Sequence, residues 1–275
     1  MVVWRVPPLT PSGNAAAFAR SFDATLQSAN TRRLFGATGY FNVGYWTADT
    51  PDLRTACDRL VDEVVAAVPA TAQWILDAGC GLGAGTRRIG ERRTLAKVLA
   101  GNISLWQLAR ARELGAAPTV AMDAARLPFR SRALDAVIAI ESPQHFDTRA
   151  AFAAEALRVL RPGGVLSLTD MLFSDADVIG PWMIPQANRL RSIADYEQVL
   201  RESGFTQIAV EDVTAVTWRP FCRVMRAGFG GDAATMDAIE GSVSHYLVVR
   251  ATRPDARSMP VRTSRRLRTR VDMVE

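Results

Sequence analysis

Cysteine and histidine are scarce in this 275-residue chain, and their scarcity excludes several kinds of site. The three cysteines, Cys57, Cys80 and Cys222, are an odd number without metal-ligand spacing. This argues against a disulfide framework and against a bound metal. We therefore expect reduced thiols, a cytoplasmic location and no metal site. Only two histidines, His145 and His245, are present to exchange protons near neutral pH.

Long hydrophobic runs are also absent. No apolar stretch approaches the ~20 residues that cross a bilayer, so we expect no membrane segment. The first residues, MVVWRVPPLTPSG, have a short apolar start that Pro7 and Pro8 interrupt, which predicts no signal peptide. Hydrophobic residues make up 48% and charged residues 22% of the chain, an ordinary globular composition at the upper size of one hydrophobic core. One large domain with an added cap is the expected organisation.

Net charge is low except at one end of the chain. The formal charge is +5, and residues 251–275 contain seven arginines against three acidic residues, so this stretch carries +4. A basic tail can bind phosphate nonspecifically, but such a composition is more typical of a solvated, disordered end. We expect residues 253–275 to form a disordered tail and the protein not to bind nucleic acid.

Short apolar runs alternate with helical patterns through most of the chain. Five runs are expected to be buried strands: 74–78, 97–100, 118–121, 135–140 and 164–169. Two more strands are expected in QIAVEDVT and YLVVRAT, and helices are expected over 13–35, 53–68, 104–114, 148–160 and 196–203. This alternation predicts an α/β fold, a parallel sheet with helices on both faces. In such sheets ligands bind at the carboxyl ends of the strands.

The stretch ILDAGCGLGAGT places small residues directly after the first expected strand. Glycines there remove side chains that would keep a ligand away from the backbone. Gly79, Gly81 and Ala84 satisfy the dinucleotide fingerprint G-x-G-x-x-G/A, which alone is a weak signal. That fingerprint also requires an acid about 20 residues later for the ribose hydroxyls. Asn102, in AGNIS, stands at the end of the second expected strand instead, which favours a cofactor without a pyrophosphate.

Four motifs occur in order at consistent spacing: LDAGCGLG, MDAARLPFRSRALDAVIAIES, EALRVLRPGGVLSLTD and YEQVLRESGF. Together they resemble the class I S-adenosylmethionine-dependent methyltransferases over roughly residues 40–215. The resemblance implies a Rossmann-like, doubly wound sheet of seven strands, mostly parallel with an antiparallel last strand, and S-adenosylmethionine as the cofactor. It also implies an organisation of the chain: a helical and aromatic cap over 1–50 and a methyltransferase domain over 51–252 with lid insertions near 171–193 and 215–243.

The resemblance assigns roles to residues of the expected cofactor site. Asp77 would face the methionine part, Asp123 would read the adenine amino group, and Glu141 would line the sulfonium pocket. Asn102 stands where most relatives have an acid for the ribose diol, and its amide lacks the charge assistance of a carboxylate. Tyr40, Tyr45 and Trp46, in GYFNVGYW, would wall the sulfonium through a cation–π contact or seal the site against water. Packing of these aromatic rings on the core is the alternative. The expected cofactor-binding residues are Tyr45, Asp77, Gly79, Gly81, Gly83, Asn102, Ile103, Gln107, Asp123, Ala124 and Glu141.

The stretch ESPQHFDTR, after the fourth expected strand, indicates the kind of methyl acceptor. It lacks the (N/D)-P-P-(Y/F) motif typical of enzymes that methylate amino groups of bases or glutamine. It resembles instead the branch that acts on small lipophilic natural products such as macrolide sugars, sterols and tocopherols. His145 is the expected general base for a hydroxyl acceptor. Asp170, at the end of SLTD, is expected to orient His145 or to share its role.

Methyl transfer to a hydroxyl of a small hydrophobic natural product is therefore the expected reaction. An electron-rich carbon, such as a prenyl alkene or an aromatic ring, is the alternative acceptor, and a cyclisation could then follow. A third hypothesis is a non-methylating cyclase that keeps the cofactor as a scaffold. A fourth, a nucleic-acid methyltransferase, is disfavoured by the missing motif. The two insertions contain Met, Trp and Phe, and they are expected to cover an apolar acceptor. The stretch AGFGGD is the expected hinge of this cover. Assembly of the chain into a homo-oligomer is a further possibility that the sequence leaves open.

Overall fold

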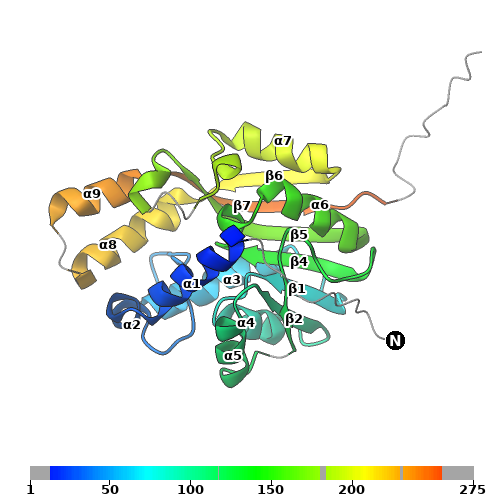
Figure 1. Ribbon diagram of the computed structural model, residues 1–275, viewed down its shortest axis with the longest axis horizontal. Coiled ribbons are helices and arrows are strands. Elements are labelled where there is room, and N and C mark those ends of the chain that lie inside the picture. The colour runs from blue at the N-terminus through cyan, green and yellow to red at the C-terminus, as the bar shows by residue number, and fades with distance from the viewer. Residues whose placement is uncertain (1–12, 117, 180–183, 230–231, 256–275) are drawn as a thin grey trace, which may run out of the picture.

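Seven strands form one sheet in the computed structural model, which describes residues 13–116, 118–179, 184–229 and 232–255 (Figure 1). The strand order is β3-β2-β1-β4-β5-β7-β6. The strands are β1 Trp74–Ala78, β2 Lys97–Asn102, β3 Thr119–Ala121, β4 Leu134–Ile140, β5 Leu160–Phe173, β6 Thr206–Asp212 and β7 Val243–Thr252. Strands β1 to β5 run parallel to one another, and β7 runs antiparallel to both β5 and β6. The expected Rossmann-like sheet with an antiparallel last strand is confirmed.

Helices cover both faces of this sheet. They are α1 Gly13–Gln27, α2 Ala29–Phe35, α3 Leu53–Ala66, α4 Ala84–Arg92, α5 Leu105–Glu113, α6 Arg149–Val159, α7 Ile193–Ser203, α8 Trp218–Phe229 and α9 Ala233–Gly241. Because successive strand residues face opposite sides, Leu76 packs in the core shared with α6 and α7. Its neighbour Ile75 packs in the core shared with α3, α4 and α8. The sheet is therefore buried on both faces, as its apolar strands require.

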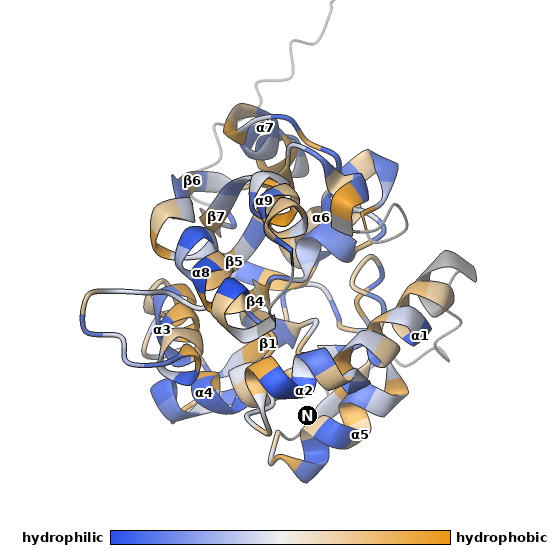
Figure 2. Cartoon of the chain, turned by 90° about the vertical axis from the view of Figure 1, so that its left-hand side faces the viewer, coloured by the Kyte–Doolittle hydropathy of each residue, from blue (hydrophilic) through white to orange (hydrophobic). Residues whose placement is uncertain are grey.

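Helices α8 and α9 lie within 215–243, where only a lid insertion was expected, and two expected elements differ in their bounds. The helix expected over 13–35 is broken at Ser28, whose extended backbone and side chain cap the second helix by accepting a hydrogen bond from Thr31 N. The fifth strand is longer than 164–169, because Leu160 already pairs with Leu134 on the neighbouring strand across an irregularity in the register. The break at Ser28 leaves α1 as a separate helix beside the sheet (Figure 2).

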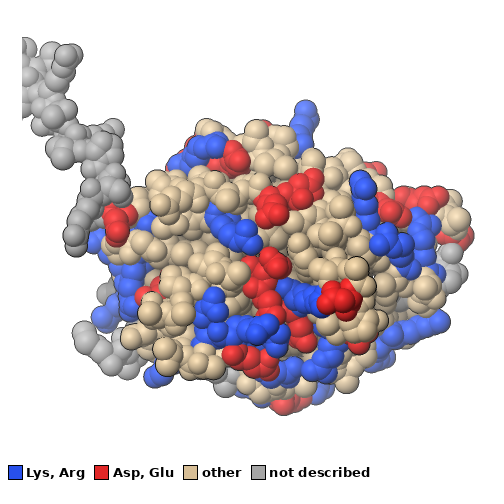
Figure 3. Space-filling view, turned by 180° about the vertical axis from the view of Figure 1, so that it is seen from behind, with Lys and Arg blue, Asp and Glu red and all other residues tan. Residues whose placement is uncertain are grey.

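The last strand ends at Thr252, as expected. The disordered tail expected over 253–275 begins too early, because Arg253 Nη1 donates hydrogen bonds to the carbonyl oxygens of Leu157 at 2.6 Å and Leu160 at 2.7 Å. Residues 256–275 lie outside the described part of the chain. None of the described helices has the length and apolarity needed to cross a membrane. On the face seen in Figure 3, basic and acidic side chains are interspersed, so that face presents no continuous basic surface. All three cysteines are buried and none forms a disulfide.

Candidate active site

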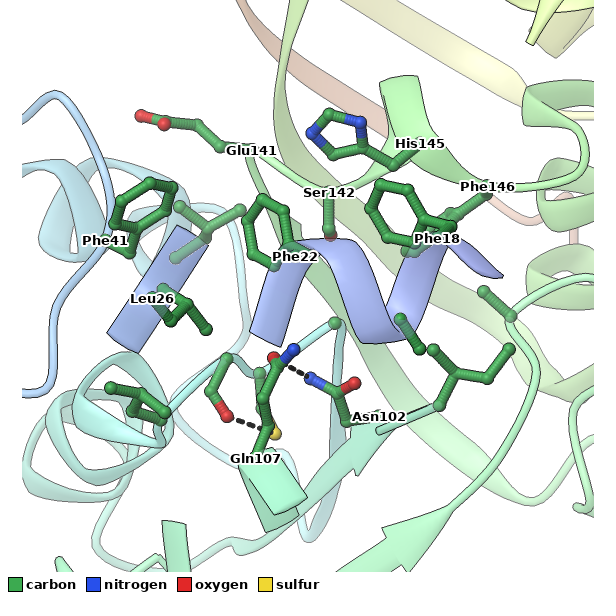
Figure 4. Close-up of a pocket in the computed structure, with 18 of the residues that line it drawn as sticks. Phe18, Phe22, Leu26, Phe41, Asn102, Gln107, Glu141, Ser142, His145 and Phe146 are labelled. Atoms are coloured by element: carbon green, nitrogen blue, oxygen red, sulfur yellow. Dashed lines mark hydrogen bonds between the residues drawn. The ribbon is translucent and has the colours of Figure 1, made fainter. Parts of the chain in front are cut away.

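A cavity of about 760 Å³ opens where β1, β2 and β4 end. Its walls come from the loops that follow the parallel strands, the expected place for a ligand in such a sheet. Helix α1 and residues 184–189 supply further walls (Figure 4). Of the expected cofactor-binding residues, nine line it: Asp77, Gly79, Gly81, Asn102, Ile103, Gln107, Asp123, Ala124 and Glu141.

The glycine loop, residues 79–83, leaves backbone open to the cavity at one glycine and allows two helices to pack closely at another. Gly79, Gly81 and Gly83 all have positive φ, at 82°, 53° and 88°, a region that favours glycine. A Cβ on Gly81 would meet open space, so the bare backbone there is available to a ligand. A Cβ on Gly83 would lie 2.7 Å from Ala116 Cβ and 2.9 Å from Ala111 Cβ, and Gly83 does not line the cavity. We therefore reassign Gly83 from cofactor contact to the packing of α4 on α5.

Asp77 is a buried acid at the end of β1, 2% exposed. The Thr86 hydroxyl donates a hydrogen bond to its Oδ2 at 2.6 Å. Burial raises the pKa of Asp77 to about 6, although the hydrogen bond opposes the shift. The carboxyl group lines the cavity, where a cationic or hydrogen-bond-donating group of a ligand would stabilise its ionised form.

Asn102 and Gln107 form one hydrogen-bonded pair in the cavity wall. Asn102 Nδ2 donates to Gln107 Oε1 at 2.9 Å, and Asn102 Oδ1 accepts from Ser104 N at 2.9 Å. Ser104 caps α5, since its Oγ accepts from Gln107 N at 3.1 Å. The Gln107 side-chain amide donates to Asp23 on α1, its Nε2 2.7 Å from Oδ1. No local pattern in the sequence indicates this contact.

Glu141 directly follows β4 and has φ at 49°, an uncommon conformation for a residue with a side chain. Its Oε1 accepts hydrogen bonds from Val43 N at 2.8 Å and from the Tyr246 hydroxyl at 2.6 Å. Burial raises the pKa of Glu141 to about 7, although both hydrogen bonds oppose the shift. The Glu141 side chain lines the cavity, and in Figure 4 it extends away from the His145 imidazole. Its carboxyl group therefore gains and loses its proton near neutral pH.

His145 lies in the same cavity wall, at the end of a short 3₁₀ helix, Pro143–His145, that follows β4. Its imidazole stacks on Phe18 of α1, with ring centroids 5.0 Å apart, and lies 5.7 Å from the Phe22 ring (Figure 4). Phe22 in turn makes an edge contact with Phe41 at 5.4 Å. Sequence reasoning missed these aromatic residues of α1. The apolar residues of 13–35 predict a helix, but they do not show which part of the protein that helix packs against.

Asp170 does not reach the cavity wall. It is fully buried, and its carboxylate accepts hydrogen bonds from Arg149 Nε at 2.6 Å, Arg149 Nη2 at 2.9 Å and the Tyr196 hydroxyl at 2.8 Å. Both oxygens are therefore engaged away from His145. The placement does not support the expected role of Asp170 in orienting that histidine, and we reassign it to an internal ion pair.

Asn188 joins two walls of the cavity. Its Nδ2 donates to the carbonyl oxygens of Gln144 at 3.0 Å and Phe146 at 2.7 Å, on either side of His145. Its Oδ1 accepts from Arg149 N at 2.8 Å, and the Arg149 guanidinium also bonds the Asn188 carbonyl. The segment 184–189, part of the expected lid near 171–193, is thereby fixed to the loop that carries His145.

Two other expectations are not met by the placement of the residues. Tyr45 does not line the cavity; its neighbours Tyr40, Phe41 and Asn42 do. Within the described part of 215–243, no residue lines the cavity either. Helix α8 packs instead in the core behind the sheet and against α2, with Phe221 and Phe35 rings 6.1 Å apart. The expected hinge at 227–232 lies partly outside the described residues.

Comparisons with known proteins agree with this site. A family model described as a methyltransferase domain matches residues 76–168. An O-methyltransferase of Pyrenophora dematioidea is 32% identical over 203 residues, covering 68% of this chain and 75% of the relative. The 27-O-demethylrifamycin SV methyltransferase of Amycolatopsis mediterranei (strain S699) is 31% identical over 192 residues, 63% of this chain and 69% of the relative.

A similar solved structure is the [4+2]-cyclase SpnF, with a TM-score of 0.69 and 25% identity over 90% of this chain and 98% of that one. The sheet and the bare glycine loop define a Rossmann-like protein with a ligand site at the ends of its parallel strands. With these relatives, the chain belongs to the class I S-adenosylmethionine-dependent methyltransferases, in the branch of natural-product enzymes. Its cofactor is S-adenosylmethionine.

Proposed function

We propose that this enzyme transfers the methyl group of S-adenosylmethionine to a hydroxyl group of a small hydrophobic natural product of polyketide, macrolide or sugar type. The observation that carries the proposal is the position of His145, a basic side chain in the wall of the same cavity as the glycine loop and among aromatic rings of α1. Relatives named O-methyltransferases support the choice of oxygen as the acceptor atom.

The cofactor, when bound, supplies an electrophilic methyl group on a sulfonium centre. The Gly81 backbone, Asp77, Asn102 and Asp123 would hold it, and all four line the cavity. A free hydroxyl is a weak nucleophile, and it must lose its proton as its oxygen forms the new bond. The His145 imidazole would accept that proton and release it to solvent after the product leaves.

The apolar walls serve the same reaction. Phe18, Phe22, Phe41, Phe146 and Ile184 line the cavity and would surround a hydrophobic acceptor. An apolar pocket with a few polar groups is typical of sites for small organic ligands. Exclusion of water from such a site also strengthens the electrostatic interactions inside it.

Glu141 supports a second candidate, methylation of a prenyl or aromatic carbon with or without cyclisation. With its pKa raised to about 7, the ionised form of this carboxyl group in the cavity wall is a stronger base than an ordinary carboxylate, and it would accept a proton from a cation formed on carbon. The similarity to a [4+2]-cyclase keeps the non-methylating scaffold hypothesis alongside it.

One experiment separates these candidates. The enzyme is incubated with S-adenosylmethionine labelled with carbon-13 in its methyl group and with pairs of acceptors, one hydroxylated and one with the same hydroxyl blocked. Carbon-13 spectra then show whether the label is bound to oxygen or to carbon. We expect label on oxygen and no reaction with the blocked acceptor. Label on carbon would establish the second candidate, and a rearranged, unlabelled product would establish the cyclase.

A further inference from the structure

Helix α1 is attached to the rest of the protein by few contacts. Of its described side chains, residues 17–27, only Leu26 is buried. Its inner face, formed by Ala17, Phe18, Ser21, Phe22 and Leu26, lines the cavity rather than a closed core. An element with little buried apolar surface opens at low free energy, so specific polar contacts decide how firmly α1 covers the cavity.

Asp23 makes such contacts. Its two carboxylate oxygens accept separate hydrogen bonds from the opposite wall, Oδ1 from Gln107 Nε2 at 2.7 Å and Oδ2 from Ser104 Oγ at 2.8 Å. Hydrogen bonds to an ionised acceptor are about twice as strong as neutral ones. Through Gln107 the contact continues to Asn102, which ends β2. Asn102 thus places an amide, not a carboxylate, at the end of β2. The carboxylate at this wall of the cavity is that of Asp23, from α1.

The same helix reaches the other side of the cavity. Phe18 stacks on His145, and Phe22 lies between His145 and Phe41. Asp23 is adjacent to Phe22 in the chain and about one and a half turns from Phe18. When Asp23 holds α1 against the cofactor wall, the two phenyl rings are held against the imidazole.

We propose that Asp23 is a latch, a positioning residue that closes α1 over the cavity by binding Ser104 and Gln107, and that cofactor binding and closure of α1 are thermodynamically linked. A ligand that contacts the closed form shifts the helix toward it, because its affinity for the two forms differs. The apparent affinity for the cofactor depends on the fraction of the protein that is closed, so weakening the latch should weaken cofactor binding. The proposal needs cofactor binding alone and holds for either acceptor atom.

Calorimetry with S-adenosylhomocysteine tests the linkage. Asp23→Asn removes the charge and one acceptor, and we expect affinity to fall about 5- to 20-fold, the lower range of such couplings. Asp23→Glu keeps the charge and should bind within about threefold of the native protein. Arg20→Gln, which also removes one charge but on the exposed side of the same helix, is the matched control and should bind as the native protein does. Equal affinity for Asp23→Asn and Arg20→Gln would overturn the proposal.

Histidine ring signals in nuclear magnetic resonance spectra report closure directly, because the chain has only two histidines. The Phe18 ring current should displace the His145 signals in the closed form. In Asp23→Asn these signals should move toward ordinary values, while those of His245, on β7, stay in place and show that the fold is intact. Unmoved His145 signals would contradict the latch.

A third measurement needs no substitution. In the native protein, S-adenosylhomocysteine should slow amide hydrogen exchange in residues 17–27. Unchanged exchange there, with slowed exchange in the glycine loop, would overturn the linkage while leaving cofactor binding established.

Discussion

Arg149 and Asp170 form a buried, bidentate ion pair, with Arg149 Nε 2.6 Å from Asp170 Oδ2 and Arg149 Nη2 2.9 Å from Asp170 Oδ1. The pair ties α6 to β5, with 4% of the arginine and none of the aspartate side chain exposed. Tyr196 on α7 donates a third hydrogen bond to the same carboxylate. Three elements on one side of the active site therefore share a single buried charge.

Removing that charge should destabilise the fold. Asp170→Asn leaves the buried guanidinium without its counter-charge, and we expect a loss of about 3–5 kcal/mol in the free energy of unfolding. The control is Asp212→Asn, which removes the partner of His245 in a half-exposed pair and should cost about 0–1 kcal/mol. Denaturant titration measures both. A stable Asp170→Asn protein that has lost turnover would restore Asp170 to the catalytic machinery.

The glycine loop gives a second prediction, because Gly81 and Gly83 should fail in different ways. Gly81→Ala adds a methyl group in open space at positive φ, which costs about 1–2 kcal/mol of stability. It should weaken S-adenosylhomocysteine binding at least about tenfold, or about 1.4 kcal/mol. Gly83→Ala forces a clash with Ala111 and Ala116 and should cost roughly 2–5 kcal/mol of stability, while the folded fraction keeps its cofactor affinity. Unaltered binding in Gly81→Ala would remove the glycine loop from the cofactor site.

His145 should matter for turnover and not for cofactor affinity. If it is the general base, His145→Ala lowers the turnover number by about 10²–10⁴-fold. His245→Ala is the matched control, because that residue pairs with Asp212 and does not line the cavity. Turnover is measured with the acceptor found by labelling, and affinity by calorimetry. Native turnover in His145→Ala, combined with lost turnover in Glu141→Gln, would transfer the base role to the carboxyl group.

The protonation of Glu141 predicts how stability depends on pH. The folded protein raises its pKa from 4.5 to about 7, so the native state holds a proton that the unfolded chain releases. The resulting stabilisation is complete below about pH 4.5 and is lost as pH rises through about 7. Glu141→Gln keeps an acceptor for Val43 and Tyr246 but does not titrate. Its stability relative to the native protein should therefore rise over that pH range.

Melting temperatures of the two cofactor-free proteins, recorded from about pH 4.5 to about pH 8, measure this difference. The full effect is at most about 3 kcal/mol, at about 1.4 kcal/mol for each pKa unit, and partial exposure of Glu141 to the cavity reduces it. The pKa of Asp77 is raised in the same direction, but it is common to both proteins and cancels. A pH-independent difference would show that Glu141 is ionised in the folded protein.

Local patterns were enough to predict the sheet and half of the cavity wall. Each strand from β1 to β5 is an apolar run bounded by polar or small residues, so its burial follows from composition. Gly79, Gly81 and Asp77 follow the first of these runs directly, and the carboxyl ends of parallel strands gather at one edge. The position of the cofactor site therefore needed no knowledge of distant contacts.

The other half of the wall depends on contacts that no local pattern records. Asp23 and Gln107 are 84 positions apart in the chain, and Arg149 and Asp170 are 21 apart. Asp170 was expected at the cavity because it ends an apolar run. Its side chain instead bonds to Arg149 on α6 and Tyr196 on α7, which cover one face of the sheet. Tyr45 was misplaced for a similar reason, since an aromatic cluster does not show which of its members faces the cavity.

The place of β7 in the sheet has a consequence for synthesis on the ribosome. Strands β1 to β5 find their partners among themselves, but β6 pairs only with β7 in the described sheet, and β7 follows it by about 30 residues. Residues 206–212 therefore leave the ribosome before their partner exists, and one edge of β5, which is made earlier still, stays uncovered until the same strand emerges. An uncovered edge is a site for pairing with other chains, so the nascent enzyme is most exposed to aggregation just before residues 243–252 emerge.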